Sequence, residues 1–312
     1  MVFDLLLSYS LSNLIIPSIP IGECLSLFLS FRAHIIARAP GLQKIDKLIP
    51  LSLENLHIKK NELVINKLWI TCDKDEVNFK MNRKTFSRRI SESQEDKMKK
   101  LINFYTCGRS KIHVDRLYWH DRLPPDFLPV DMKFRVNSVE AVNDFETAIL
   151  FIDPQSFPLI TLNTDIYYIS IFDDQVVKSA ETFYLNLAID RIVTVEDFKK
   201  LNNKTVELER FSYFKIDIIP LIKHYIEAKK EIRTTFRIST CDKDFISEKL
   251  REFELAFGEY RSNLDGVNER FLPGSSKYLI PINNESRIQV YAIEEPVAYG
   301  PLKIIVKPVS GL

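Results

Sequence analysis

From residue 99 onward, the sequence repeats a short pattern in which apolar and polar residues alternate. Such alternation is typical of a β-strand with one buried face. The apolar pairs at the strand centres are Ile112/Val114, Phe134/Val136, Ile160/Leu162, Phe183/Leu185, Val206/Leu208 and Phe236/Ile238, and their first members lie 22 to 30 residues apart. This interval constrains the fold more than any other feature, because it leaves room for one strand and one short helix.

The segments between these strands have helical patterns. Four are predicted to be helices: "SVEAVNDFETAILFI" (138–152), "VTVEDFKKL" (193–201), "KIDIIPLIKHYIEAKKEI" (215–232) and "DKDFISEKLREFELAFGEY" (242–260). Thr194 is a typical N-cap residue followed by early acidic residues, and Ser138 is expected to begin the first helix in the same way. Residues 165–179 are the exception, because their helical pattern is poor.

One strand and one helix in about 20 to 30 residues is the repeat length of leucine-rich-repeat-like solenoids. A unit of this kind cannot bury its own apolar face and needs stacked neighbours. We therefore predict an α/β fold built on a divergent solenoid, since the strict leucine spacing and the asparagine ladder of standard leucine-rich repeats are absent. The alternative is an ordinary α/β domain with evenly spaced strands, because βαβ units also recur at about 30 residues or more.

The chain is predicted to contain five parts. Residues 1–50 form an N-terminal helical segment, 51–83 a small β-rich subdomain, 84–98 an exposed charged linker, 99–258 the repeat domain, and 259–312 a C-terminal β-rich cap. The cap contains three short strand patterns, "KYLIPI", "RIQVYAI" and "LKIIVK". We expect these strands to cover the apolar edge of the last repeat.

Charge and cysteine content limit the classes of function. Lys and Arg total 43 against 42 Asp and Glu, which gives a net charge of +1. This balance argues against a nucleic-acid partner, since nucleic-acid binders normally carry a basic excess. The four cysteines have no Cys-x-x-Cys spacing, so we predict reduced thiols rather than a zinc module or a disulfide framework. They are Cys24, Cys72, Cys107 and Cys241.

The apolar N-terminus does not have the features of a targeting segment. It carries Asp4 where a signal peptide has a basic start, and Pro17 and Pro20 interrupt its longest uncharged run. Neither a signal peptide nor a membrane span is therefore predicted. We expect a protein of the cytoplasm or the nucleus that has no membrane partner.

No catalytic signature is found in the sequence. The five histidines lack metal-ligand spacing, and no Gly-x-Ser-x-Gly motif is present. Glu207 and Glu209 would lie on one strand face, but no candidate base accompanies them. We predict a protein that is not an enzyme and that holds no cofactor or metal.

The polar positions of the predicted strands would line one continuous face of the solenoid. A mixed face with Tyr and Arg suits the recognition of a protein target, and the alternative is a solvated face without a partner. The candidate target-binding residues are His113, Asp115, Lys133, Arg135, Thr161, Asn163, Tyr184, Asn186, Glu207, Glu209, Arg237 and Ser239.

The predicted linker also contains two candidate phosphorylation sites. Ser91 follows Arg88 and Arg89, and Ser93 precedes acidic residues. Basophilic and acidophilic kinases use such charge patterns, and an added phosphate could pair with either arginine.

Four phrases of the sequence resemble a known family. They are "ARAPGLQKIDKLIPLSLENLHI", "KTFSRRISESQEDKMKKLINFY", "LDGVNERFLPG" and "IPINNESRIQVYAIE". From about residue 32 to its C-terminus, the chain resembles a large nematode-expanded group of F-box-like proteins (F-box type C-like) with a family-specific C-terminal domain of unknown function. The resemblance implies a substrate receptor of a cullin-type ubiquitin ligase. In such a receptor, N-terminal F-box helices bind an adaptor protein and the C-terminal region captures a target.

The resemblance also indicates which residues would bind the adaptor. A Leu-Ser-Tyr phrase at residues 7–9 precedes apolar residues at helical spacing, and the implied contacts are Leu7, Tyr9, Leu11, Leu14 and Ile15. The segment "PSIPIGECLSLFLS" then stands where the family continues its helix. Proline inside a helix costs about 3 kcal/mol or more, so this departure favours a second hypothesis.

Three functions are compatible with the sequence. The first is a non-catalytic substrate receptor of a cullin-type (SCF-like) ligase that works as a monomer apart from its complex. The second is an orphan protein-interaction solenoid that has lost adaptor binding. The third is an enzyme with an unrecognised site.

Overall fold

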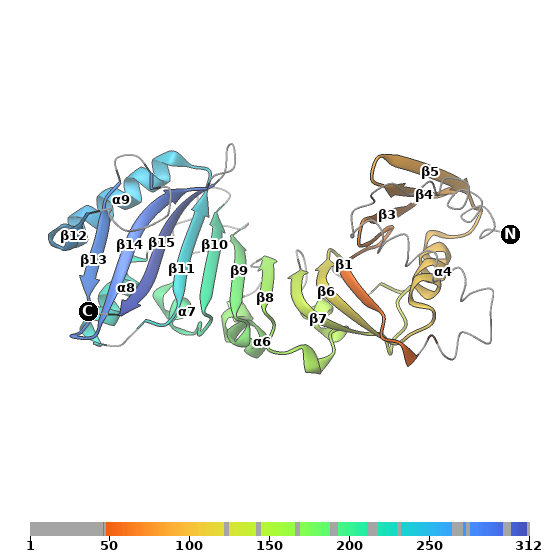
Figure 1. Cartoon of the computed structure of the whole chain (residues 1–312), viewed down its shortest axis with the longest axis horizontal. Coiled ribbons are helices and arrows are strands. Elements are labelled where there is room, and N and C mark those ends of the chain that lie inside the picture. The colour runs from red at the N-terminus through yellow and green to blue at the C-terminus, as the bar shows by residue number, and fades with distance from the viewer. Residues whose placement is uncertain are drawn as a thin grey trace, which may run out of the picture. The chain divides into compact units, whose positions relative to one another are not determined.

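The structure is a computed structural model of the 312-residue chain. It describes residues 46, 48–121, 125–141, 145–165, 169–187, 193–210, 218–229, 232–263, 271–272, 275–295 and 301–310. The chain divides into two compact units, of which the first ends at Ser156 and the second runs from Phe157 to Leu312 (Figure 1). Both units are mixed α/β structures, and among their described residues strands outnumber helices. The α/β class predicted from the sequence is therefore confirmed.

The first unit contains the strands β1 to β7 in the spatial order β7-β6-β1-β2-β3-β4-β5. Strands β1, β6 and β7 are parallel, whereas β1 to β5 form an antiparallel meander. The bounds are β1 Ser52–Lys59, β2 Glu62–Ile65, β3 Leu68–Cys72, β4 Glu76–Met81, β5 Lys84–Arg89, β6 Lys111–Trp119 and β7 Lys133–Ala141. The β-rich character predicted for residues 51–83 is confirmed.

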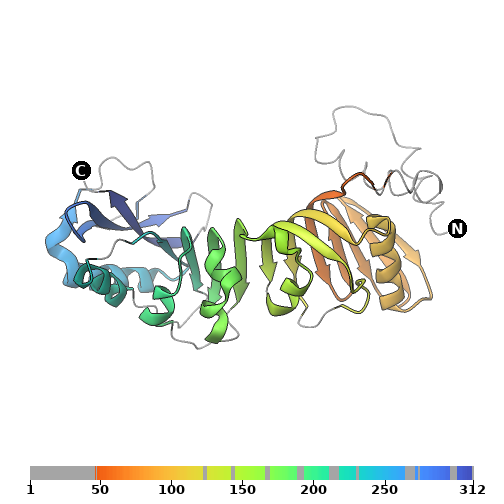
Figure 2. The same cartoon turned by 90° about the horizontal axis from the view of Figure 1, so that it is seen from below.

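Helix α4 (Gln94–Thr106) covers one face of the meander (Figure 2). Ser93 caps its first turn by accepting a hydrogen bond from the Asp96 amide, which satisfies a free donor at the helix start. The buried side chains Met98 and Ile102 lie on the covered side. The Lys97 ammonium, also buried, donates to the carbonyls of the β3–β4 turn at 2.7 and 2.8 Å. The helix is therefore held by apolar packing and by a cation that binds backbone carbonyls.

The expected linker at residues 84–98 has regular structure at both ends. Residues 84–89 form β5, and α4 begins at Gln94. Only the segment between them, which contains Ser91 and Ser93, has neither helix nor strand structure, and both serines are exposed. The charged sequence misled the prediction because β5 is an edge strand, where charged residues are common.

The segment 138–152 was predicted to be one helix, and this prediction is wrong in its first half. Ser138 lies inside β7, and only Phe145–Leu150 forms a helix, α5. The buried residues Val136 and Val139 are three positions apart, which imitates a helical period. Their partners in β6, Val114 and Leu117, are also buried and three positions apart. The alternation of buried and exposed side chains therefore changes at the same place in both strands, and their pairing continues past it.

The second unit contains the strands β8 to β15 in the order β12-β13-β14-β15-β11-β10-β9-β8. Strands β8 to β11 are parallel, and β12 to β15 are antiparallel. The bounds are β8 Thr161–Asp165, β9 Thr182–Leu187, β10 Thr205–Arg210, β11 Thr235–Thr240, β12 Arg261–Ser262, β13 Lys277–Pro281, β14 Ser286–Glu294 and β15 Leu302–Ser310. The three predicted C-terminal strands are confirmed as β13, β14 and β15. The last of these pairs with β11.

The helices of the second unit lie on one side of its sheet (Figure 2). Their bounds are α6 Gln175–Ser179, α7 Val195–Lys199, α8 Ile219–Glu227 and α9 Lys243–Phe257, with 3₁₀ turns at Pro154–Ser156 in the first unit and at Ile169–Asp173 and Gly258–Tyr260 in the second. Thr194 and Asp197 form a complete capping box at the start of α7, as the sequence predicted for Thr194. Phe198 of α7 packs edge-on against Phe236 of β11.

The predicted register of β8 is wrong by two residues. Leu162, and not Ile160, pairs with Phe183, so the buried positions of β8 are Leu162 and Thr164. Because side chains alternate with a period of two, this shift leaves the polar residues of β8 on the expected face.

The expected F-box-like residues Leu7, Tyr9, Leu11, Leu14 and Ile15 lie outside the described residues, as does Cys24. The described cysteines, Cys72, Cys107 and Cys241, are free thiols, and burial raises the pKa of Cys72 to about 11. Within the described part of the chain, no helix is long and apolar enough to cross a membrane.

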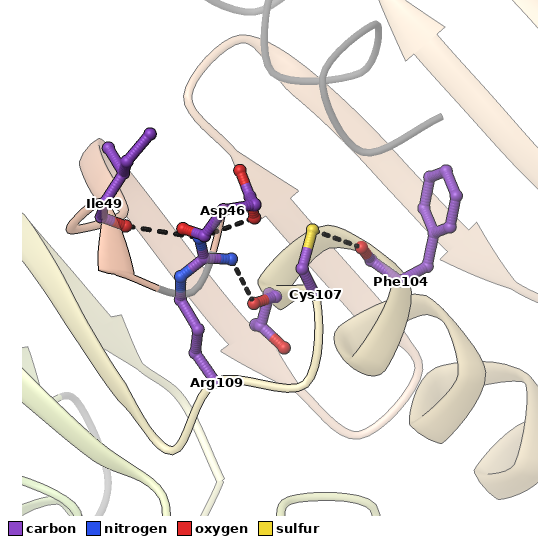
Figure 3. Close-up of polar contacts among 6 residues, drawn as sticks. Asp46, Ile49, Phe104, Cys107 and Arg109 are labelled. Atoms are coloured by element: carbon purple, nitrogen blue, oxygen red, sulfur yellow. Dashed lines mark hydrogen bonds and ion pairs between the residues drawn. The ribbon is translucent and has the colours of Figure 1, made fainter. Parts of the chain in front are cut away.

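Arg109 joins the segment before β1 to the end of α4 (Figure 3). Its guanidinium donates to the Asp46 carboxylate at 2.6 Å, to the Thr106 carbonyl at 3.1 Å and to the Ile49 carbonyl at 3.2 Å. A further hydrogen bond reaches the Asp46 carbonyl. Both charged side chains are buried, so the loss of either one leaves the other poorly compensated.

We expect Arg109→Met to lower the free energy of unfolding of the first unit by about 3 kcal/mol, because Asp46 loses its charged partner in a buried place. Both tryptophans, Trp69 and Trp119, belong to the first unit, so urea unfolding followed by tryptophan fluorescence reports on that unit. The control is Arg116→Met, which alters an exposed arginine of β6. An equal loss of stability in both variants would contradict the role given to Arg109.

Candidate functional site on the strand face

Three rows of polar side chains cross the four parallel strands of the second unit. Residues in one row are direct neighbours in the sheet, and adjacent strands lie about 4.8 Å apart. The rows are Thr161–Thr182–Thr205–Thr235, Asn163–Tyr184–Glu207–Arg237 and Asp165–Asn186–Glu209–Ser239. We call this surface the polar strand face. It includes eight of the residues that the sequence predicted to bind a target.

The polar strand face exists because each strand alternates with a period of two. The positions between the polar residues are buried and, apart from Thr164 in β8, apolar, for example Phe183 and Leu185 in β9. These side chains point toward the helices, since Phe236 on the same side contacts Phe198 of α7. The polar rows therefore lie on the side of the sheet opposite these helices (Figure 2).

Glu207 is the centre of a charged cluster at one side of this face. The Lys303 ammonium of β15 donates to Glu207 Oε1 at 2.6 Å, and the Ser239 hydroxyl donates to the same oxygen at 2.7 Å. Arg237 approaches the other oxygen at 3.8 Å, and Lys303 also pairs with Glu295 at 2.5 Å. Glu207, Ser239 and Lys303 are 5%, 3% and 9% exposed.

This cluster changes the interpretation of the acidic pair. The sequence suggested two exposed carboxylates on one strand face, but Glu207 is buried and neutralised by Lys303, whereas Glu209 is exposed. Both contacts of Glu207 Oε1 are made within the sheet, one to Lys303 of β15 and one to Ser239 of β11. Glu207 is therefore a structural residue of the face, and it joins the last parallel strands to the C-terminal strand β15.

The electrostatics of Lys303 agree with this structural role. Burial by itself lowers the pKa of the ammonium, but hydrogen bonds to Glu207 and Glu295 outweigh burial, so the pKa of Lys303 is raised. The folded protein thus holds this proton more tightly than the unfolded chain does.

The side of the face away from β15 carries amide groups and one buried carboxylate, that of Asp165. The Asn186 amide donates to Asp165 at 2.9 Å and to Asn163 at 3.3 Å, which orders these side chains across β8 and β9. Tyr184 lies between Asn163 and Glu207 in the middle row and is half-buried. This part of the face offers hydrogen-bonding groups and one aromatic ring to a partner.

The first unit holds the other four predicted face residues. His113 and Arg135 are direct neighbours in β6 and β7, and Asp115 accepts a hydrogen bond from Asn137 at 2.9 Å. Lys133 donates to the Leu150 carbonyl. Asp115 and Arg135 are exposed, whereas His113 and Lys133 are half-buried.

Sequence reasoning missed several residues of the polar strand face. Lys303 is the most important, because it neutralises Glu207, and Asp165 and the threonines Thr182, Thr205 and Thr235 were also not selected. The alternation in "LKIIVK" places Lys303 between two apolar residues and could have identified a polar position. The neighbour of β15 could not have been identified, because it depends on a pairing between strands far apart in the sequence.

The described residues show no grouping of three or more His, Cys, Asp or Glu side chains that could hold a metal ion. The polar strand face carries hydrogen-bonding groups, the Glu207–Lys303 charge cluster, the carboxylates of Asp165 and Glu209, and the ring of Tyr184.

We expect Lys303→Met to lower the free energy of unfolding of the second unit by about 3 kcal/mol, because Glu207 then stays buried without its ammonium. Hydrogen exchange of peptides from β10, β11 and β15 measures this unit separately. The double variant Lys303→Met/Glu207→Gln should regain part of the loss, since the buried charge is removed. Lys204→Met, at an exposed position before β10, is the control. A double variant that is less stable than Lys303→Met alone would refute the pairing of Lys303 with Glu207.

The contribution of Lys303 to stability should disappear in alkaline solution. Because the folded pKa is raised above the ordinary lysine value of 10.5, this contribution is fully present below pH 10.5 and is lost as the pH rises through the higher folded pKa. The test compares the free energy of urea unfolding of the wild-type chain with that of Lys303→Met, with hydrogen exchange of β15 as the readout. The difference between the two free energies should be smaller above pH 10.5 than below it. A constant difference would contradict the raised pKa.

Comparison with known proteins finds similarity to a protein-family model. Residues 93–242 match the model of a family described as a domain of unknown function (DUF3557). The match begins at the N-cap residue of α4 and ends at the N-cap residue of α9, so it contains every parallel strand from β6 to β11. Searches of the curated proteins and of the solved structures find no match. The predicted target-binding residues thus all lie in the part of the chain that is similar to this domain family.

Proposed function

We propose that this protein is a non-catalytic recognition protein that binds a protein target on its polar strand face. The observation that carries this proposal is the set of three in-register polar rows on β8 to β11. Among the described residues, the helices of the second unit lie on the opposite side of the sheet from these rows (Figure 2). Tyr184 and Arg237 lie in the middle row, and Tyr and Arg are enriched among the residues that dominate protein interfaces.

We propose further that the strand–helix segments are repeats of a divergent leucine-rich-repeat-like solenoid. The continuous parallel pairing of β8 to β11 supports this view, because each repeat adds one strand beside the last. The antiparallel strands β13 to β15 would then act as the C-terminal cap, since β15 occupies the outer edge of β11.

The target would be delivered to a cullin-type (SCF-like) ubiquitin ligase. Support for this part comes from the resemblance to F-box-like proteins of nematodes, in which an N-terminal segment binds the adaptor. The corresponding residues here are Leu7, Tyr9, Leu11, Leu14 and Ile15. Such a receptor would work in the cytoplasm or the nucleus and would be monomeric apart from its complex.

Binding of the full-length chain to the purified adaptor tests the ligase part. We expect the wild-type chain to bind the adaptor in a pull-down, and Leu11→Asp/Leu14→Asp to lose this binding because charged side chains replace the implied apolar contacts. Tyr184→Ala should bind the adaptor as the wild type does. A wild-type chain that does not bind the adaptor would instead support an orphan recognition protein.

A photo-crosslinking residue in place of Tyr184 tests the target part. We expect it to capture a protein that the same residue at Leu255, an exposed position on α9, does not capture. In a ligase receptor, that protein should become longer-lived when the chain is depleted. Arg237→Ala should reduce the capture roughly tenfold, as expected for the loss of a main interface residue. Equal capture from both positions would contradict the proposed face.

A further inference from the structure

The last strand of the first unit, β5, leaves one edge of its sheet without a partner. Its pairing with β4 runs from Lys84, which lies opposite Met81, to Arg89, which lies opposite Glu76. No described strand pairs with the other side of β5. The pairing is continuous and contains no proline in either strand. Backbone amides and carbonyls of alternate residues therefore face outward along a regular edge, which is the geometry that an added strand requires.

The hairpin formed by β4 and β5 is strongly basic. Between Val77 and Ser91 the sequence has five basic residues and no acidic residue, although the whole chain has a net charge of only +1. The basic residues are Lys80, Arg83, Lys84, Arg88 and Arg89, of which all but Arg88 are exposed. Lysine on an edge also prevents aggregation, but the excess of basic residues, with Glu76 of β4 opposite Arg89 as the acidic exception, additionally attracts a partner of the opposite charge.

An apolar row leads from the core of the first unit to this edge. Ile58, Leu63, Ile70, Phe79 and Phe86 are successive neighbours across β1 to β5. The first three are fully buried, whereas the rings of Phe79 and Phe86, 6.1 Å apart, are half-buried. A further strand beside β5 would place one apolar side chain next to Phe86 and would continue the row.

The residues beside Phe86 indicate the chemistry of such a strand. Lys84 and Arg88 are two positions before and after Phe86, so they lie on the same face of β5. An acidic side chain two positions on each side of the apolar residue would meet these cations. The pattern acid-x-apolar-x-acid in an extended segment is thus complementary to β5 in backbone, shape and charge.

The hairpin is also held in place before any partner binds. The Ser87 hydroxyl donates to the side-chain oxygen Oδ1 of Asn78, and the side-chain Nδ2 of Asn78 donates to the Asp73 carboxylate at 2.8 Å and to the Glu76 carboxylate at 3.1 Å. These contacts join β5, β4 and the preceding turn. An ordered edge loses little conformational freedom on binding, which favours affinity.

We propose that the outer edge of β5 is a docking site for an extended acidic segment of a partner protein, which adds as a strand with the pattern acid-x-apolar-x-acid. This site is separate from the polar strand face and does not depend on the function proposed for it. A single-stranded nucleic acid is the competing ligand for a basic surface with an accessible aromatic ring, but it would not pair with the backbone edge.

Fluorescence anisotropy with the full-length chain tests the proposal. The probe is a labelled synthetic peptide with the centre Asp-Thr-Val-Thr-Asp. We expect saturable binding, and we expect the matched peptide Asp-Pro-Val-Pro-Asp, which lacks the two amides, to bind at least about tenfold more weakly, because prolines cannot donate to a strand. Equal binding of both peptides would overturn the proposal.

Charge reversal in the protein provides the second arm. Lys84→Glu/Arg88→Glu should weaken binding of the acidic peptide roughly tenfold or more, since attraction becomes repulsion. The same variant should gain binding of a Lys-Thr-Val-Thr-Lys peptide. Lys204→Glu, in the second unit, is the control and should change neither affinity. A urea unfolding curve that is followed by tryptophan fluorescence and matches that of the wild type verifies that the variant is folded.

Two results would remove the proposed site. The first is the absence of saturable binding by the acidic peptide to the wild-type chain. The second is a single-stranded oligonucleotide that binds more tightly than the peptide and displaces it from the chain, because that result assigns the surface to a polyanion.

Discussion

The whole structure depends on the register of neighbouring strands. Side chains alternate along each strand, so one residue of slippage would exchange the buried and the exposed sets. In the second unit, four parallel strands keep Phe183, Val206 and Phe236 in one buried row and their polar neighbours in another. The helices can cover the apolar side only because this row is unbroken. The polar strand face is the direct consequence of the same register.

The buried charges of the protein stand where distant parts of the chain meet. Glu207 binds Lys303 across 96 residues of sequence, and Arg109 binds Asp46 across 63. A buried ion pair adds little net stability compared with apolar packing, but breaking one is costly. Such pairs therefore select one arrangement of the chain against others, since a wrong pairing would leave a charge buried alone. In the second unit, the Glu207–Lys303 pair joins β10 to β15, which lies beside β11.

The two kinds of open surface differ in physical character. On the polar strand face, much of the hydrogen-bonding capacity is already used within the protein, as the contacts of Asn186 and Ser239 show. A partner there would meet an ordered set of side chains. At the edge of β5, the available groups belong to the backbone, and side chains such as Lys84 and Phe86 flank them. Recognition at an edge depends on an extended partner, whereas recognition on a face depends on its surface shape.

The sequence alone determined the positions of most strands, the capping of α7 by Thr194 and the separation of polar from apolar residues, because these features depend on local alternation and local hydrogen bonds. It misassigned Ser138, since the spacing of Val136 and Val139 suits a helix as well as a shifted strand. Only the tertiary structure decided the register of β8, the burial of Glu207 by Lys303 and the lack of a described partner for β5. Each of these depends on which strands lie side by side, and pairing across a long loop is set by the packing of the whole unit and not by the residues of one strand.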